Sequence, residues 1–561
     1  MKGDFTRDTF QPAKHFSRVL MQQGRVTLDA DFNEQAAISL RYLRTLARDI
    51  IGPYAAPAGK DANGDDLGGF KLKLDPGPDI SISKGCYYVD GILVENHTDN
   101  CTYKKQPDYQ PPADDPLLKA PAGEQAFFVY LDVWERHITP IDDDSIREKA
   151  LGGPDTCTRA KVVWQVKALL LTEDLKTEMA DANKKVFNRL NALWKNKAKL
   201  EKKFKPEANK PLSEEQIRLL IRLQDRDEQL TRLIHLSSLP MHKVLLSQLV
   251  RLSNAKLAAR VDPGQKTEDA CVTPPASKYR GAENQLYRVE IHHGGKADEA
   301  TFKWSRDNGS VATAWLAGEG SDLQVASTRG FAAGNWVELS DDTLDLRGES
   351  GVLVQLARVE SDTLSVDPAT TLPLISDFPK NPKIRRWDQI ATDAISLAKD
   401  NGLRIQESPA NPKPDQIVWT DLEDGVQIQF SHGGEYRTGD YWLIPARVAT
   451  GNVEWPQADE LNPQPLPPRG IEHHYALLGI ASRANANREL TIKDARFEFW
   501  PLMSRVVESA PSGAPYHRLV QPPSPPDAAP SKAVPAPKKP PKARKRQAKK
   551  SPAPPAEGAP S

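Results

Sequence analysis

The sequence predicts an α+β protein that is mainly β, with sandwich-like or barrel-like modules, an N-terminal helix and an inserted α-helical hairpin or bundle. Short runs rich in β-branched and aromatic residues recur along most of the 561-residue chain, and turn-forming dipeptides separate many of them. Residues 172–260 differ, because they are rich in Leu, Lys, Glu, Arg and Gln with almost no glycine, a composition typical of helices. The length suits roughly two to four domains.

Residues 1–60 are expected to form a docking segment and a helix. Gly24 precedes Arg25 and is free to take positive φ at a turn. Asp31 stands three residues before Glu34, which predicts a capping box at the start of the helix. The helix start also explains the alternation of acidic residues with Asn33 better than a calcium loop does.

The helix itself is predicted at about residues 33–51, and Gly52-Pro53 ends it. Its apolar residues fall on one face at helical spacing, so the helix is amphipathic and we expect this face to be buried. The face consists of Ile38, Tyr42, Leu43, Leu46 and Ile50.

Residues 61–171 are predicted to form the first part of a β domain. Asp90-Gly91 joins two apolar runs and is a strong hairpin signal, because both positions tolerate positive φ. Residues 126–138 and 161–171 carry many aromatic and β-branched side chains, which predicts two long strands.

Residues 172–260 are predicted to be a helical insertion of three helices, separated by Pro206, Pro211 and Pro240. A projecting antiparallel hairpin or a small bundle would satisfy this pattern. The charged residues of the insertion fit either a solvated face or a coiled coil that binds a partner.

Residues 261–410 are predicted to form the second part of the β domain, and the regular spacing of strands suggests a sandwich or barrel. Asn308-Gly309 predicts a two-residue hairpin turn. The expected strands are 287–293, 301–305, 310–316, 335–341, 352–360 and 363–367.

Residues 411–510 are expected to form a C-terminal β module, with Asp424-Gly425 as a turn and a final strand near 491–500. Residues 511–561 are rich in Pro, Ala, Lys and Ser without apolar periodicity, so we expect a disordered tail.

Several long blocks of the sequence carry a family resemblance. They are KGDFTRDTFQPAKHFSRVLMQQGRVTLDADFNEQ (2–35) and residues 129–166, 278–295, 301–313, 436–456 and 470–481. In these blocks the chain is similar to an uncharacterised bacterial family, a domain of unknown function, encoded near genes for contractile phage-tail-like particles, or contractile injection systems. The resemblance implies association with such a particle, and it brings no catalytic residues with it.

The charges are balanced overall, with 75 Lys and Arg against 75 Asp and Glu, so no global field attracts nucleic acid. The tail is an exception, because residues 521–561 carry nine basic and two acidic residues. It could make weak, nonspecific contacts with nucleic acid or an acidic surface, or simply act as a solubilising or partner-reaching tail. The basic cluster consists of Lys538, Lys539, Lys542, Arg544, Lys545, Arg546, Lys549 and Lys550.

The sequence contains none of the common catalytic motifs, so we expect no enzymatic activity, no catalytic residues and no cofactor. The pairs His292-His293 and His473-His474 are in predicted strands, where neighbours face opposite sides, so we expect no metal site. The loop containing Asp61 has calcium-like alternation without the required glutamate. The four cysteines form no CxxC pair and are expected to be free thiols.

These observations lead us to expect a structural or adaptor component of a contractile phage-tail-like particle, such as a baseplate protein, that acts through protein–protein interfaces. One alternative is a fibre-like or carbohydrate-binding module in which Trp304, Trp315, Trp336, Trp442 and Trp455 form a sugar-binding platform. A second alternative is a hydrolase or toxin cargo.

The candidate interface consists of Gly24, Arg25, Asp31, Asn33, Arg306, Asp307, Asn308, Gly309, Tyr441 and Trp442. The expected partners are other particle proteins, with a homo-oligomer as a further possibility. No membrane span or secretory signal is visible in the sequence, so we expect the protein in the cytoplasm, assembled into a particle that is released or associated with the envelope.

Overall fold

The computed structural model describes residues 1–61, 64–74, 79–112, 114–119, 125–175, 239–250, 253–264, 278–392, 395–413, 416–457, 462–483 and 490–500, with a few single residues between 177 and 222. The described residues all belong to one compact unit, residues 1–510. They are mainly β, with 37% in strands and 16% in helices, which confirms the predicted fold class. Most of the predicted helical insertion, and the whole tail, lie outside the described residues.

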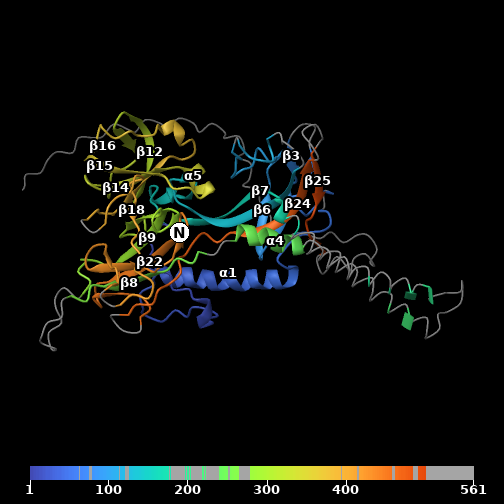
Figure 1. Cartoon of the computed structure of the whole chain (residues 1–561), viewed down its shortest axis with the longest axis horizontal. Helices are drawn as coiled ribbons and strands as arrows, with labels where there is room; N and C mark the ends of the chain where they lie inside the picture. Colours follow the sequence, from blue (N-terminus) through green and yellow to red (C-terminus); the bar gives the residue numbers. More distant parts are fainter. Residues whose placement is uncertain are drawn as a thin grey trace, which may run out of the picture. The chain divides into compact units, whose positions relative to one another are not determined.

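Three sheets draw their strands from residues 54–170 and 474–499 (Figure 1). The first has the order β26 (Glu498–Phe499), β1 (Tyr54–Pro57), β4 (Gly85–Val89) and β5 (Ile92–Asn96). The second pairs β2 (Leu72–Leu74) with β3 (Ile80–Ile82). The third has the order β25 (Thr491–Asp494), β24 (His474–Arg483), β6 (Gln125–Ile138) and β7 (Arg159–Leu170).

The central part of the chain forms a closed six-stranded barrel, one of the two architectures that the strand spacing predicts. Its core contains residues such as Val337, Leu364 and Ile384, none of which is exposed. The strand order is β12 (Ala312–Glu319), β13 (Asp322–Val325), β16 (Thr363–Val366), β15 (Val352–Glu360), β14 (Trp336–Ser340) and β17 (Lys383–Trp387).

The remaining strands form three further sheets around a large apolar core. One is five-stranded, with β18 (Leu403–Arg404), β11 (Thr301–Ser305), β9 (Gln285–His293), β22 (Tyr441–Arg447) and β23 (Asn452–Val453). The others contain β19 (Thr420–Asp421), β20 (Val426–Phe430) and β8 (Leu257–Val261), and β10 (Gly295–Lys296) with β21 (Glu435–Tyr436).

The described part of the chain contains three α-helices and four 3₁₀ helices. The α-helices are α1 (Asp29–Ile51), α4 (Leu239–Leu249) and α5 (Asp342–Arg347). The 3₁₀ helices are Pro12–Lys14, Asp144–Ile146, Lys149–Leu151 and Ile375–Asp377. None of the helices in these residues has the length and apolar character needed to cross a membrane.

The predicted hairpin at Asp90-Gly91 and the predicted turn at Asp424-Gly425 are confirmed. Asp90 and Gly91 have positive φ between the paired strands β4 and β5, and Asp424 and Gly425 have positive φ between β19 and β20. The prediction of a hairpin at Asn308-Gly309 is wrong, although both residues have positive φ. β11 pairs with β9 and β18, whereas β12 belongs to the barrel, so this turn joins two different sheets.

Two other predictions need correction. The helical insertion was expected to reach residue 260, but residues 257–261 form β8, whose partner β20 lies far along the chain. The prediction of one β module at residues 411–510 is wrong, because its strands belong to several sheets. β20 pairs with β8, β22 pairs with β9, and β24 pairs with β6. Pairing between distant strands is not encoded in local periodicity.

Helix α1 begins at Asp29, four residues earlier than predicted, and the Asp31–Glu34 capping box is wrong. Asp31 is instead the third helical residue, and its carboxylate accepts a hydrogen bond from Leu28 N at 3.4 Å. Glu34 accepts one from Thr9 Oγ1 at 2.6 Å. The acidic residues of the first turns therefore hold the preceding segment onto the helix.

Candidate functional site

The N-terminal segment and one face of α1 expose an unusual concentration of apolar side chains. Of the 23 large hydrophobic residues exposed in the described part of the chain, 11 lie within 35 consecutive residues. We call these 11 the N-terminal apolar surface: Phe16, Leu20, Met21, Val26, Leu28, Phe32, Leu40, Tyr42, Leu43, Leu46 and Ile50. Monomeric proteins seldom expose so many apolar residues in one place, and such surfaces commonly bind other proteins.

The predicted burial of the whole helix stripe is therefore wrong within this chain. Of the five stripe residues only Ile38 is buried, at 2% exposure, whereas Leu43 is 64% and Ile50 61% exposed. Ala30 and Ile38 are the only residues of α1 that the rest of the chain buries. The more apolar side of the helix faces outward.

Close contacts fix α1 in this orientation. Gly91, at φ +80°, lies against the helix backbone, and a Cβ atom there would be 2.1 Å from Arg44 O. The guanidinium of Arg44 forms an ion pair with Glu135 at 2.8 Å. On the other side, Gln35 Oε1 accepts a hydrogen bond from Val19 N at 2.8 Å. The outward apolar face is thus a consequence of specific packing.

A small cavity of about 140 Å³ lies where the N-terminal segment meets α1. Its lining includes the aromatic residues Phe10, Phe16 and Tyr42, together with Ile38. A cavity of this volume and lining fits one apolar side chain of a partner, the kind of anchor that dominates many protein interfaces.

Four residues of the sequence-predicted interface lie on or beside this surface. Gly24 has the expected positive φ, and Arg25 N donates to Gln22 O in the same turn. Asn33 is exposed on α1, whereas Asp31 is partly buried at the helix start. The stripe residues Tyr42, Leu43, Leu46 and Ile50, which the sequence pattern assigned to a buried face, follow them along α1 and are exposed.

The predicted group from Arg306 to Gly309 lies largely inside the body. Asn308 is 1% exposed, and its amide donates to Gly3 O at 2.9 Å and to Met1 O at 3.2 Å. Arg306 forms an ion pair with Glu423 at 2.6 Å. This turn holds the first residues of the chain in place and is not an exposed tip.

Tyr441 and Trp442 also have internal roles. The hydroxyl of Tyr441 accepts a hydrogen bond from the Met1 amine at 3.0 Å, and the guanidinium of Arg288 lies 3.6 Å from its ring centroid. Trp442 is 2% exposed, and its Nε1 donates to Leu466 O at 3.0 Å. The Trp442 side chain is therefore part of the core.

The proposed tryptophan platform is wrong for the same reason. The five tryptophans are between 1% and 8% exposed, so none presents a ring face to a sugar. They pack in the apolar cores of the barrel and of the neighbouring sheets.

A polar cleft of about 550 Å³ lies at the first residues of the chain. Met1 and Lys2 line it together with residues of β6, β9, the barrel and the loops before β22 and β24. Its charges are mixed and mostly paired, as in Lys2 with Glu290 at 2.9 Å. Burial raises the pKa of Asp440 to about 6, and its Oδ2 has no hydrogen-bond partner among the described residues.

Two histidine–aspartate pairs border this cleft. His473 Nδ1 lies 2.7 Å from Asp132 Oδ1, and His474 Nδ1 lies 2.9 Å from Asp90 Oδ2. Lys167 also contacts Asp132, at 2.8 Å. Although burial alone would raise it, the pKa of Asp132 is lowered by His473 and Lys167. These pairs do not form a cluster of three or more metal-ligating groups within the described residues.

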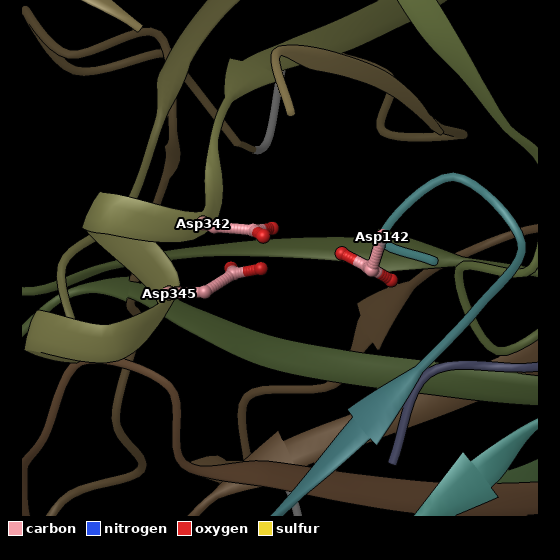
Figure 2. A group of neighbouring side chains, drawn as sticks. All are labelled: Asp142, Asp342 and Asp345. Atoms are coloured by element: carbon pink, nitrogen blue, oxygen red, sulfur yellow. The ribbon is translucent and has the colours of Figure 1, made fainter. Parts of the chain in front are cut away.

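Three aspartates converge at the end of β6, as Figure 2 shows. Asp142 comes from the loop after β6, and Asp342 and Asp345 come from α5. Their ligand oxygens lie within 4.8 Å of one another, the spacing at which carboxylates can hold a metal ion. Sequence reasoning missed this group, because Asp142 is about 200 residues from the other two.

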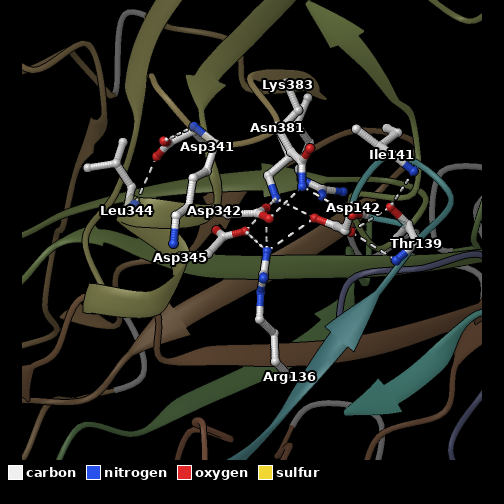
Figure 3. Close-up of polar contacts among 12 residues, drawn as sticks. Arg136, Thr139, Ile141, Asp142, Asp341, Asp342, Leu344, Asp345, Asn381 and Lys383 are labelled. Carbon is white, nitrogen blue, oxygen red and sulfur yellow. Dashed lines mark hydrogen bonds and ion pairs between the residues drawn. The ribbon is translucent and has the colours of Figure 1, made fainter. Parts of the chain in front are cut away.

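Two cations already occupy the space between these carboxylates (Figure 3). Lys383 Nζ lies 2.8, 3.1 and 2.6 Å from Asp142, Asp342 and Asp345, and Arg136 contacts the same three side chains. Burial alone would raise the pKa of Asp142, but Lys383 and Arg136 hold it well below its usual range. We call this cluster the Lys383 junction. It is an ion-pair network that joins the β6 sheet to the barrel.

A second buried network joins the barrel to the five-stranded sheet. Lys303 of β11 is fully buried, and its Nζ lies 2.6 Å from Glu338 of β14 and 3.5 Å from Glu290 of β9. It is also 3.3 Å from His292 Nδ1. Burial, together with the positive charge of Lys303, lowers the pKa of His292 to about 4. We call this cluster the Lys303 junction.

The basic cluster at residues 538–550 lies outside the described residues. So does Cys271, one of the four predicted free thiols. The other three cysteines form no disulfide among the described residues; Cys86 and Cys101 are buried and Cys157 is exposed.

Comparison with known proteins identifies a family and no function. No curated protein and no solved structure matches the chain. A family described as of unknown function, DUF6519, matches residues 1–559. The chain therefore belongs to this family of unknown function.

Proposed function

We propose that this protein is a non-enzymatic structural or adaptor component of a contractile phage-tail-like particle. The observation that carries the interaction part of this proposal is the N-terminal apolar surface. Its apolar side chains are held outward by close packing of α1 on the body. The link to a contractile particle rests on the sequence resemblance described above. The proposed location is the cytoplasm, in a particle that is released or bound to the envelope.

Keeping this much apolar surface in contact with water is unfavourable in free energy, and association with a partner would remove that contact. Burying apolar surface yields about 25 cal/mol per Å². Fully burying one leucine or phenylalanine side chain therefore contributes roughly 1.5–3 kcal/mol. Because Leu43 and Leu46 are about 60% exposed in the chain alone, a partner that covers them gains binding energy without rearranging the core.

The proposal is tested by tagging the chromosomal gene and purifying the protein from cells that make the particle. We expect sheath, tube or baseplate proteins to co-purify with the wild type. Leu43→Glu/Leu46→Glu should abolish their recovery and leave the far-UV circular dichroism spectrum of the folded protein unchanged. The matched control is Leu151→Glu/Leu374→Glu, which places the same charges at residues that are 72% and 69% exposed elsewhere. Equal recovery with both double variants would contradict the proposal.

A hydrolase remains the second candidate, because Asp132 orients His473 at the edge of a cleft large enough for a substrate. The hydrogen bonds of the described residues include none from His473 to a Ser, Thr or Cys nucleophile. If the protein is a hydrolase, turnover of ester, peptide or glycoside substrates should fall at least 100-fold in His473→Gln, by roughly the contribution of general-base catalysis. Because we propose a non-enzymatic role, we expect no turnover by the wild type or by His473→Gln.

A further inference from the structure

We propose that helix α1 pairs with α1 of a second copy of this chain, in antiparallel orientation about a twofold axis. This inference rests on the proposed function, since it names one partner for part of the same surface. The outward face of α1 supports it through its spacing, its exposed area and the sizes of its residues, and the helix dipole supports the orientation.

The spacing of the outward face suits a second helix. Phe32, Ala36, Ser39, Leu43, Leu46 and Ile50 follow one another at intervals of four and three residues. This alternation places them on one seam with a 3.5-residue repeat, the pattern that lets two helices interlock their side chains. All six are exposed in the single chain.

The exposed area is sufficient for a stable contact. The large apolar residues of α1 are between 40% and 67% exposed. With about 180 Å² for a full side chain, the four in the seam together with the flanking Leu40 and Tyr42 offer roughly 600 Å². A standard interface buries about 800 Å² on each partner, so this outward face supplies most of that area.

The sizes of the seam residues favour the antiparallel arrangement. An axis near residue 41 places Phe32 opposite Ile50, Ala36 opposite Leu46 and Ser39 opposite Leu43 of the other copy. Each small residue then meets a large one, which fills the space between the helices. A parallel pair would instead place Ala36 on Ala36 and Ser39 on Ser39, leaving two underfilled layers at the centre.

The helix dipoles favour the same arrangement. Antiparallel pairing sets the two α1 dipoles against each other, whereas parallel pairing aligns them. The charged side chains of α1 do not decide the orientation, because Glu34 accepts a hydrogen bond from Thr9 and Arg44 pairs with Glu135 within the chain.

The oligomeric state of the full chain tests this inference directly. We expect a dimer by light scattering, and a rise of at least about 100-fold in its dissociation constant for Leu43→Glu/Leu46→Glu. The Leu151→Glu/Leu374→Glu control should remain a dimer. A wild type that is monomeric at about 100 µM overturns the inference.

Cross-linking tests the orientation, in a background that carries Cys157→Ser and Cys271→Ser. Mixed Phe32→Cys and Ile50→Cys chains should form a disulfide with each other. Phe32→Cys chains alone should not, because the two cysteines would be about 27 Å apart along the helices. Self-linking of Phe32→Cys chains would overturn the antiparallel arrangement.

The outcomes separate this inference from the proposed function. A monomeric wild type whose particle partners are still lost in Leu43→Glu/Leu46→Glu would mean that another protein covers the seam, so the inference fails and the proposed function stands. If the wild type is a monomer and the same substitutions lower its stability, the seam is covered by residues of the chain itself. The inference and the proposed function then both fail.

Discussion

The Lys383 junction and the outward face of α1 both depart from the usual rule that charged residues are exposed and apolar residues are buried. The junction buries charges, and the α1 face exposes apolar side chains. The junction holds five charged side chains, three carboxylates and two cations, where solvent is mostly excluded. Lys383, for example, is 3% exposed. The α1 face places large apolar side chains in solvent, with Phe32 at 67% exposure. Buried charges are costly unless every partner is present, so they specify one arrangement of the chain's own sheets. Exposed apolar residues gain energy only when another surface arrives.

The largest expected effect comes from removing the cation of the junction. Lys383→Met should destabilise the protein by about 3–5 kcal/mol, because three carboxylates are left with only Arg136. Denaturant unfolding measures this difference. As a control, Arg358→Ala removes one partner of an exposed ion pair with Glu360 and should change stability by less than about 0.5 kcal/mol. Similar losses in the two variants would contradict the account of the junction.

The two sides of α1 should respond differently to the same kind of truncation. Ile38→Ala removes a side chain that is 2% exposed and should cost about 2–5 kcal/mol of stability. Leu43→Ala removes one that is 64% exposed and should cost less than about 0.5 kcal/mol, while weakening association. Thermal unfolding with light scattering on each variant gives both numbers. A large stability loss in Leu43→Ala would show that the seam is covered within the chain.

Acid should weaken the buried networks and leave the α1 seam unaffected. The pKa of His292 is about 4 in the folded protein and near 6.5 in the unfolded chain, so the unfolded state binds the proton first as the pH falls. Stability contributed by neutral His292 is therefore complete above pH 6.5 and is lost between about pH 6.5 and 4. Unfolding free energies across this range should fall less steeply in His292→Gln. An unchanged slope would contradict this assignment.

Salt should produce the smallest effect. The seam contains no charged residue, so the dimer dissociation constant should change less than about threefold between roughly 50 and 500 mM NaCl. Sedimentation at several protein concentrations measures it. A steep weakening with salt would mean that the flanking charges, and not the apolar seam, dominate the contact.

Local features of the fold could be predicted from the sequence, and features set by distant pairing could not. The long strands β6 and β7 and the turns at Asp90-Gly91 and Asp424-Gly425 follow from residue type and periodicity. The Asn308-Gly309 turn was located correctly, but the sheet that receives β12 depends on β17, about 70 residues away. No local pattern contains that information.

The candidate site shows the same limit. Lys303 stands between apolar residues in β11, a signal that it has a buried partner, but the sequence cannot show that this partner is Glu338 of the barrel. The apolar stripe of α1 was located correctly, but its predicted burial is wrong for every stripe residue except Ile38. Which side the body covers depends on the close approach of Gly91 to the helix, and so could not be predicted.

The central claim is that the outward face of α1 is an interface between proteins. A high-resolution map of the assembled particle that contains this protein tests it most directly. We predict that Phe32, Leu43, Leu46 and Ile50 are in contact with another polypeptide throughout the map. A map in which these side chains face solvent while the protein is held through other surfaces would contradict the claim.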